Sequence, residues 1–214
     1  TPVMPFGPDH RIDFDRLGRV LDFHLQNGAD ALALPMHAAE SVSLTEDEKR
    51  ALLVFAIERV QGRVPVLAHV SNAGSGIAAS FARGAQAAGA AAIVATTPYY
   101  WTPPPAMLLT HFAEIGAAVD IPLFAYNAPD EMVTRLTAEL AVALIAKLPN
   151  FAGVVDVSLD WQFMIELMTE APRTRPDFQL LSGTELMVSP GAIGATGMFS
   201  SLAAVAPRLV RRLH

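Results

Sequence analysis

The chain of 214 residues contains no cysteine, which excludes disulfide bonds, thiolate metal sites and a cysteine nucleophile. It has no basic cluster longer than Arg211-Arg212 and a net charge of −6, so we expect no nucleic-acid partner. The longest apolar runs, such as residues 140–146, are too short to cross a bilayer, and the N-terminus has no signal segment. We therefore expect a cytoplasmic protein without a membrane partner.

Short apolar runs alternate with amphipathic stretches along the whole chain, which indicates strands that alternate with helices. The expected strands are residues 1–6, 31–34, 64–70, 91–96, 121–126, 151–157, 178–181 and 196–200. The expected helices are residues 13–26, 45–60, 77–88, 106–118, 137–148, 159–170, 185–193 and 203–213. The strands are continuous apolar runs, as expected when both faces of a sheet are covered.

Eight such units in one chain favour a closed (β/α)8 barrel that forms a single domain over residues 1–214. An open doubly wound sheet would place a glycine-rich phosphate loop after the first strand, and residues 7–10 do not form one. The chain begins within an expected strand and ends within an expected helix, so we expect it to be a piece of a longer chain.

Active sites of such barrels lie at the carboxyl ends of the strands, where several motifs occur in a characteristic order. These motifs are Glu40-Ser41, Pro98-Tyr99-Tyr100, Tyr126-Asn127-Ala128-Pro129, Leu181-Ser182-Gly183 and Ala206-Pro207. In this order and at these positions the chain resembles the dihydrodipicolinate synthase and N-acetylneuraminate lyase family of pyruvate-dependent class I aldolases. The resemblance covers nearly all 214 residues and implies the barrel fold, and we expect this chain to be without the family's further C-terminal helices.

The family's Schiff-base lysine corresponds to Val155, in a strand that reads Gly-Val-Val-Asp, and valine cannot form an imine. The chain has only two lysines, Lys49 and Lys147, and both fall on helices expected to pack outside the barrel. The resemblance therefore predicts a divergent member that lacks the imine mechanism.

Other ligands of the family's substrate are also changed. The paired threonines that hold the pyruvate carboxylate correspond to His37 and Ala38, and an arginine is replaced by Glu131. His69 ends the strand next to that of His37, so the two rings are expected side by side at the barrel mouth. Three roles are open for this pair. The histidines are hydrogen-bonded framework residues at the barrel mouth, or they bind an anionic substrate and transfer protons, or they ligate a metal with Glu185 as a third ligand.

The resemblance makes Tyr126 the proton-relay phenol, although a core aromatic is an equal alternative. It makes Tyr100 a catalytic residue that reaches into a neighbouring subunit, or, more simply, an interface aromatic. Either role of Tyr100 predicts a homodimer or homotetramer. The further substrate-binding candidates are Asn127, Ser182 and Gly183.

Two functions remain open from the sequence. The first is a lyase, aldolase-like or dehydratase-like, that acts on a small oxo or hydroxy acid without a lysine Schiff base, a cofactor or a metal. The second is a catalytically inactive homologue that serves as a ligand-binding or structural subunit.

Overall fold

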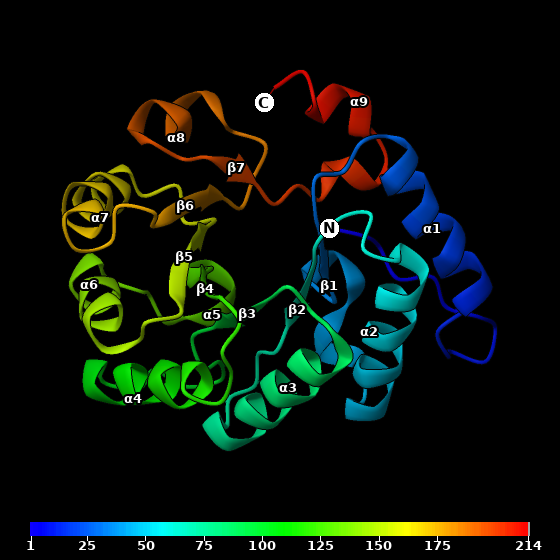
Figure 1. Cartoon of the computed structure of the whole chain (residues 1–214), viewed down its shortest axis with the longest axis horizontal. Coiled ribbons are helices and arrows are strands. Elements are labelled where there is room, and N and C mark those ends of the chain that lie inside the picture. Colours follow the sequence, from blue (N-terminus) through cyan, green and yellow to red (C-terminus); the bar gives the residue numbers. More distant parts are fainter. Residues whose placement is uncertain (214) are drawn as a thin grey trace.

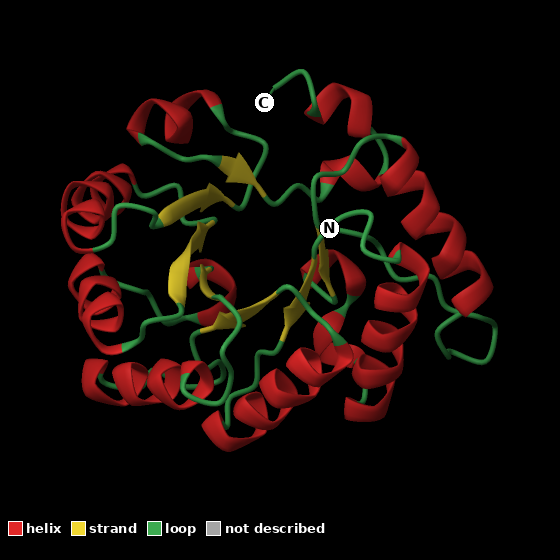
Figure 2. Cartoon of the chain, in the orientation of Figure 1, coloured by secondary structure: helices red, strands yellow, loops and turns green. Residues whose placement is uncertain are grey.

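The structure is a computed structural model that describes residues 1–213. Seven parallel strands form one sheet in the order β1-β2-β3-β4-β5-β6-β7, so each strand pairs with the next one in the chain. The sheet is curled, and the helices surround it on the outside (Figures 1 and 2). The expected α/β architecture with a parallel sheet is confirmed.

The strands are short, and six of them agree closely with the predicted ranges. They are β1 (Leu32–Leu34), β2 (Val66–His69), β3 (Ala92–Thr96), β4 (Leu123–Asn127), β5 (Phe151–Asp156), β6 (Gln179–Ser182) and β7 (Gly197–Met198).

The first α-helix precedes β1 and the others follow strands, and short 3-10 turns lie in the loops after β1 and β7. The α-helices are α1 (Phe14–Gln26), α2 (Glu46–Val60), α3 (Ser75–Ala88), α4 (Pro105–Gly116), α5 (Pro129–Met132), α6 (Ala138–Lys147), α7 (Trp161–Thr174), α8 (Val188–Ile193) and α9 (Pro207–Val210). The 3-10 turns are η1 (His37–Ala39), η2 (Ser41–Ser43) and η3 (Leu202–Ala204). Within residues 1–213, no helix has both the length and the apolar composition needed to span a membrane.

Local sequence signals fix the ends of several helices. The Thr45 hydroxyl accepts the N–H of Glu48, and the Glu48 carboxylate accepts the N–H of Thr45, which forms a complete capping box at the start of α2. Gly89 and Gly194 end α3 and α8 with φ of 96° and 110°, a left-handed conformation that glycine adopts without strain.

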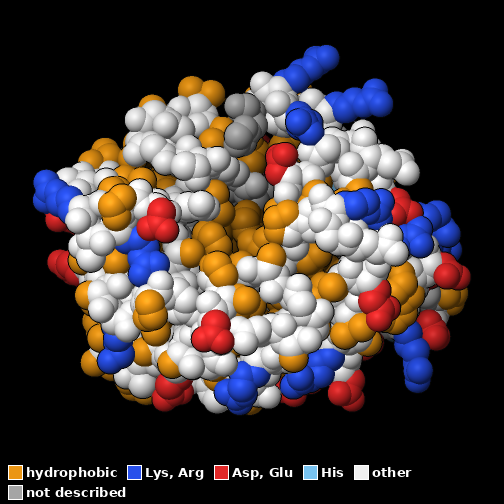
Figure 3. All heavy atoms as spheres, in the orientation of Figure 1, with side chains coloured by type: hydrophobic (Ala, Val, Ile, Leu, Met, Phe, Trp, Pro, Cys, Tyr) orange, Lys and Arg blue, Asp and Glu red, His pale blue; other side chains and the backbone are white. Residues whose placement is uncertain are grey.

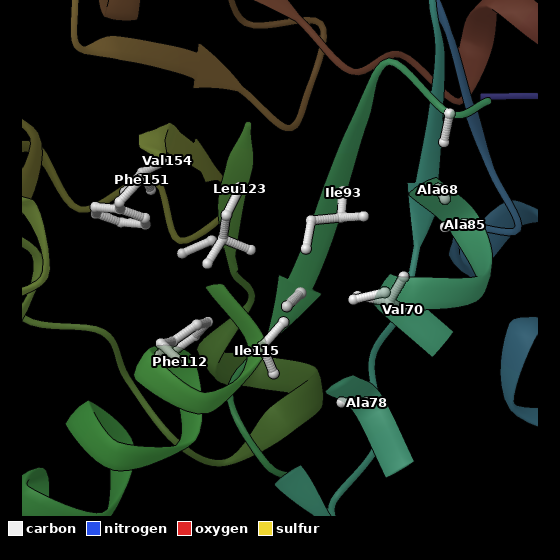
Figure 4. Close-up of a cluster of buried hydrophobic side chains, with 14 of the residues drawn as sticks. Ala68, Val70, Ala78, Ala85, Ile93, Phe112, Ile115, Leu123, Phe151 and Val154 are labelled. Carbon is white, nitrogen blue, oxygen red and sulfur yellow. The ribbon is translucent and has the colours of Figure 1, made fainter. Parts of the chain in front are cut away.

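The strand residues alternate between two hydrophobic clusters. The larger cluster lies between the sheet and the helices, where Ile93, Leu123 and Phe151 meet Phe112 and Ile115 (Figure 4). The smaller cluster lies on the inner face of the curl and contains Val94, Phe124, Tyr126 and Val155 among others. Because side chains alternate along a strand, Val154 belongs to the outer cluster and Val155 to the inner one.

The predicted first strand is wrong, and so is the count of eight strands. In residues 1–6, Phe6 forms only one antiparallel bridge, to Ile12, and the described sheet has no pairing between β7 and β1. Pro2 and Pro5 carry no N–H group, so this segment has few donors for a ladder.

The predicted last helix, residues 203–213, is also wrong. It is divided into η3 and α9 around Ala206, and Pro207 begins α9. Proline lacks the N–H that a continuous helix needs at this position and its ring clashes with the preceding turn, so the two pieces cannot join.

Candidate functional site

Three of the predicted site residues meet at the carboxyl ends of neighbouring strands. His37 lies in η1 after β1, His69 ends β2, and Tyr126 lies near the end of β4. The ring centroids of His37 and Tyr126 are 5.3 Å apart, and those of His37 and His69 are 6.3 Å apart. The predicted proximity of the two histidines is confirmed, and the His37–Tyr126 contact adds the phenol to the group.

His69 is fixed by a chain of hydrogen bonds. Its Nε2 lies 2.7 Å from Ser71 Oγ, and Ser71 Oγ accepts the N–H of Thr96 at 2.8 Å. A neutral imidazole has one N–H, so which of the two groups donates depends on the tautomer of the His69 ring. Burial, followed by the nearby charges of His37 and Lys49, lowers the pKa of His69 to about 3. His69 is therefore neutral near pH 7 and supplies no cation to the site.

Tyr126 is kept in its protonated form. Its side chain is only 8% exposed, and burial, reinforced by Glu131 and Asp156, raises its pKa to about 12. The phenol is thus a hydrogen-bond donor, able to face an oxygen that gains negative charge.

His37 differs from its neighbours because it is exposed. Its side chain makes no hydrogen bond to any part of residues 1–213, and its ring contacts that of Tyr126.

The structure places Asn127 and Asp156 away from these rings, in a buried network outside the inner cluster. Asn127 Nδ2 donates to Asp156 Oδ1 at 2.6 Å, and Asn127 Oδ1 accepts the N–H of Leu136 at 3.0 Å. Ser158 Oγ lies 2.9 Å from both oxygens of Asp156. Both ends of the Asn127 amide are thus used within the protein, which favours a structural role over the predicted contact with substrate. Alternation along β5 places Asp156 on the opposite side of the strand from Val155.

Ser182 and Gly183 are also engaged with the framework. Ser182 Oγ donates to the Thr184 carbonyl at 2.9 Å, and Gly183 N donates to the Asp156 carbonyl at 2.7 Å. A Cβ on Gly183 would lie 2.0 Å from Val157 Cγ1, so only glycine fits between β5 and β6.

Tyr100 and Ala38 are at the same end of the sheet but outside the group of rings. Tyr100 is 97% exposed, with φ of 84°, in the loop between β3 and α4. Ala38 is half-buried in η1 and offers only its backbone and a methyl group.

Both lysines lie on the helices, as predicted. Lys49 Nζ is 5.7 Å from the centre of the Phe81 ring, and burial lowers the lysine's pKa. Lys147 is exposed in the last turn of α6. Val155, by contrast, is 0% exposed inside the curl and pairs in register with Tyr126.

Glu185, the third ligand expected if His37 and His69 bind a metal, is engaged with other groups. Its Oε1 accepts the hydroxyl of Ser200 at 2.6 Å and the N–H of Leu202 at 2.9 Å. Within residues 1–213, no three His, Cys, Asp or Glu side chains are grouped so that they could hold a metal ion.

A cavity of about 790 Å³ lies inside the curl toward the amino ends of the strands, where Pro65, Ala91 and Pro122 line it. Its apolar wall includes Leu67, Phe124 and Leu181, and Figure 3 shows a central hollow lined by hydrophobic side chains. Neither histidine of the site nor Tyr126 lines this cavity, because the group of rings lies toward the opposite, carboxyl ends of the strands.

Two residues near the rings were not among the predicted site residues. Ser71 links His69 to the next strand, and Thr96 ends β3 beside Tyr126. The signal that could have found them is their spacing, because each lies two residues beyond an inward-facing position, His69 or Val94.

Comparisons with known proteins agree with the resemblance seen in the motifs. The sequence model described as "Dihydrodipicolinate synthetase family" matches residues 1–214. The 4-hydroxy-tetrahydrodipicolinate synthase of Azoarcus sp. (strain BH72) is 34% identical over 212 residues, which are 99% of this chain and 71% of that protein. The enzyme of the same name from Bacillus subtilis (strain 168) is 30% identical over 92% of this chain and 68% of its own length.

Solved structures give the same result. The crystal structure of dihydrodipicolinate synthase from Aquifex aeolicus has a TM-score of 0.94 and 27% identity over 98% of this chain and 71% of its own. A prophage protein of E. coli K12 from the dihydrodipicolinic acid synthase family, solved in complex with pyruvate, has a TM-score of 0.94 and 26% identity over the same shares. The seven-stranded sheet therefore matches most of the fold of these proteins.

Proposed function

Because the chain belongs to the dihydrodipicolinate synthetase family, we propose that it is a lyase-type enzyme for a small oxo or hydroxy acid that works without a lysine imine. The observation that carries the proposal is the buried Val155 beside Tyr126. The resemblance puts the imine-forming lysine at this position, and both lysines of the chain lie on outer helices. Without an imine, the reaction must proceed through an enolate of the free 2-oxo acid.

Tyr126 supports this chemistry as a neutral donor. As a base removes a proton from the carbon next to the carbonyl, the carbonyl oxygen gains negative charge and accepts the phenol hydrogen bond. The raised pKa of Tyr126 keeps the proton on the phenol, so the tyrosine stabilises the enolate without losing the proton to it.

His37 is the proton carrier in this proposal. It is exposed, and its ring centroid lies 5.3 Å from that of Tyr126. The base takes the proton from carbon, and the same proton returns to the oxygen of the carbonyl partner when the new C–C bond forms. His69 is neutral and is held by its hydrogen bond with Ser71, and in this proposal its ring limits where the His37 ring can lie.

The electrostatics of the group favour binding through hydrogen bonds rather than ion pairs. His69 is neutral, and the residue at the resemblance's arginine position is the exposed acid Glu131. We therefore expect weak, millimolar binding of carboxylate substrates, because a charge-assisted contact is about twice as strong as a neutral one.

Self-association belongs to the same proposal. Tyr100 and its neighbour Trp101 are exposed aromatics at the carboxyl ends of the strands, and aromatic side chains are enriched at subunit interfaces. We propose a homodimer or homotetramer in which this loop is part of the contact.

The second candidate is the catalytically inactive homologue that binds a ligand or serves as a structural subunit. It is favoured by the close packing of the His37 and Tyr126 rings and by a cavity that neither residue lines. In this case the apolar inside of the curl, not the ring group, receives the ligand.

A combined binding and turnover experiment separates the two. Pyruvate at ten times its dissociation constant should stabilise the folded state by about 1.4 kcal/mol and raise the melting temperature by about 3–5 °C. With an aldehyde added, consumption of pyruvate should fall at least about 100-fold in Tyr126→Phe and remain unchanged in the control Tyr99→Phe. Binding without turnover in the wild type would favour the inactive homologue, and neither binding nor turnover would refute the proposed substrate class.

A further inference from the structure

Thr96 carries a buried hydroxyl that has no partner. The residue ends β3 and is 1% exposed, and Oγ1 makes no hydrogen bond to any other group within residues 1–213. A buried donor and acceptor left unpaired is costly to the fold, and native proteins retain such groups at few places.

The direction of the Thr96 side chain follows from alternation along β3. Ala92 and Val94 belong to the inner cluster, and Thr96 is the next residue of the same parity. In the sheet register Thr96 pairs with Tyr126, and Tyr126 pairs with Val155. Neighbouring strands are about 4.8 Å apart, so the three side chains form one inward-facing row.

Ser71, which lies next to Thr96 on β2's side, already has its hydrogen-bond partners. Ser71 Oγ accepts the Thr96 backbone N–H and pairs with His69, so it has no need of the hydroxyl. Thr97, which points the other way, donates to the Thr134 carbonyl at 3.1 Å. Of the two adjacent threonines, only the inward-facing one is left without a partner in the described chain.

We infer that Thr96 is a specificity-determining residue whose hydroxyl binds the oxygen on C2 of the substrate acid, an inference that rests on the proposed function. The row that holds Thr96 also holds Tyr126 and Val155, which is where the reacting carbon would lie in the absence of an imine. A hydroxyl both donates and accepts, so Thr96 can bind a 2-oxo oxygen or a 2-hydroxyl group. It has no partner in an acid that lacks oxygen at C2.

The test uses Thr96→Val, which keeps the shape of the side chain and removes the hydroxyl. Its control is Thr134→Val, because Thr134 is also buried with an unpaired hydroxyl but lies in the loop between α5 and α6. Without ligand, both variants should melt a few degrees higher than the wild type, since each loses an unsatisfied polar group.

The probes are pyruvate, lactate and propanoate, with affinities measured by calorimetry. Wild type and Thr134→Val should bind pyruvate and lactate at least about tenfold more tightly than propanoate, and Thr96→Val should lose most of this preference, because only the Tyr126 phenol then remains to recognise the C2 oxygen. A Thr96→Val protein that retains the tenfold preference, or that melts lower than the wild type, would overturn this inference and leave the proposed function standing. A wild type that binds none of the three acids would overturn both.

Discussion

The stability of the protein should fall as the pH is lowered from 7 to 5, and His111 should account for a defined part of the loss. Its side chain on α4 is 2% exposed, with Nδ1 3.0 Å from Ser75 Oγ. Burial lowers its pKa to about 4, well under the usual 6.5. The unfolded chain therefore takes up a proton below pH 6.5, whereas the folded chain does not until about pH 4.

The size of the effect follows from these two values. The histidine's contribution is fully present above pH 6.5 and is lost as the pH falls toward 4. The difference in bound protons between the unfolded and folded states, integrated from pH 7 to pH 5, is about 1.4. This corresponds to a loss of about 2 kcal/mol of unfolding free energy. His24, buried on α1 with its pKa also lowered to about 4, should behave in the same way.

Urea unfolding at pH 7 and pH 5 measures this directly. In His111→Gln the fall in unfolding free energy between the two pH values should be about 2 kcal/mol smaller than in the wild type, whatever the variant's own stability. His10→Gln, at an exposed histidine, is the matched control and should leave the fall unchanged. An equal fall in His111→Gln and the wild type would refute the idea that the folded state excludes the proton from this ring.

Three further changes test other parts of the account. Asn127→Ala should lower the unfolding free energy by about 3 kcal/mol in urea titrations, because Asp156 and the Leu136 N–H each lose a buried partner; a loss below about 0.5 kcal/mol would contradict the network's role. Tyr100→Ala should weaken self-association about 30-fold in sedimentation experiments, with no loss of folding stability, and an unchanged assembly would place the contact elsewhere. Val155→Lys should lose several kcal/mol of stability because the amine is buried, yet form a borohydride-trappable adduct with pyruvate; a folded variant without adduct would show that the row does not hold the reacting carbon.

Much of the fold could be predicted because strand and helix signals agree locally with the final structure. The continuous apolar runs at β2 to β6 and the Thr45–Glu48 capping box are examples. The first strand could not be predicted correctly, because residues 1–6 look extended, whereas whether they pair depends on contacts with β7 and β1 that no local signal reports.

The candidate site was predicted in part. Barrel geometry alone brings His37 and His69 together at the strand ends, and alternation alone sends Val155 inward. The relay from His69 through Ser71 to the Thr96 backbone could not be predicted, since it depends on the register between β2 and β3 and on rotamers. The single-domain organisation, the assembly and the cytoplasmic location stay predictions.

The most direct test of the central claim is reduction of the wild-type protein with borohydride in the presence of pyruvate, followed by intact-mass measurement. The account predicts an unchanged mass, since Lys49 lies against Phe81 and Lys147 is exposed on the outer face of α6. A stoichiometric mass increase that peptide mapping assigns to either lysine would contradict it.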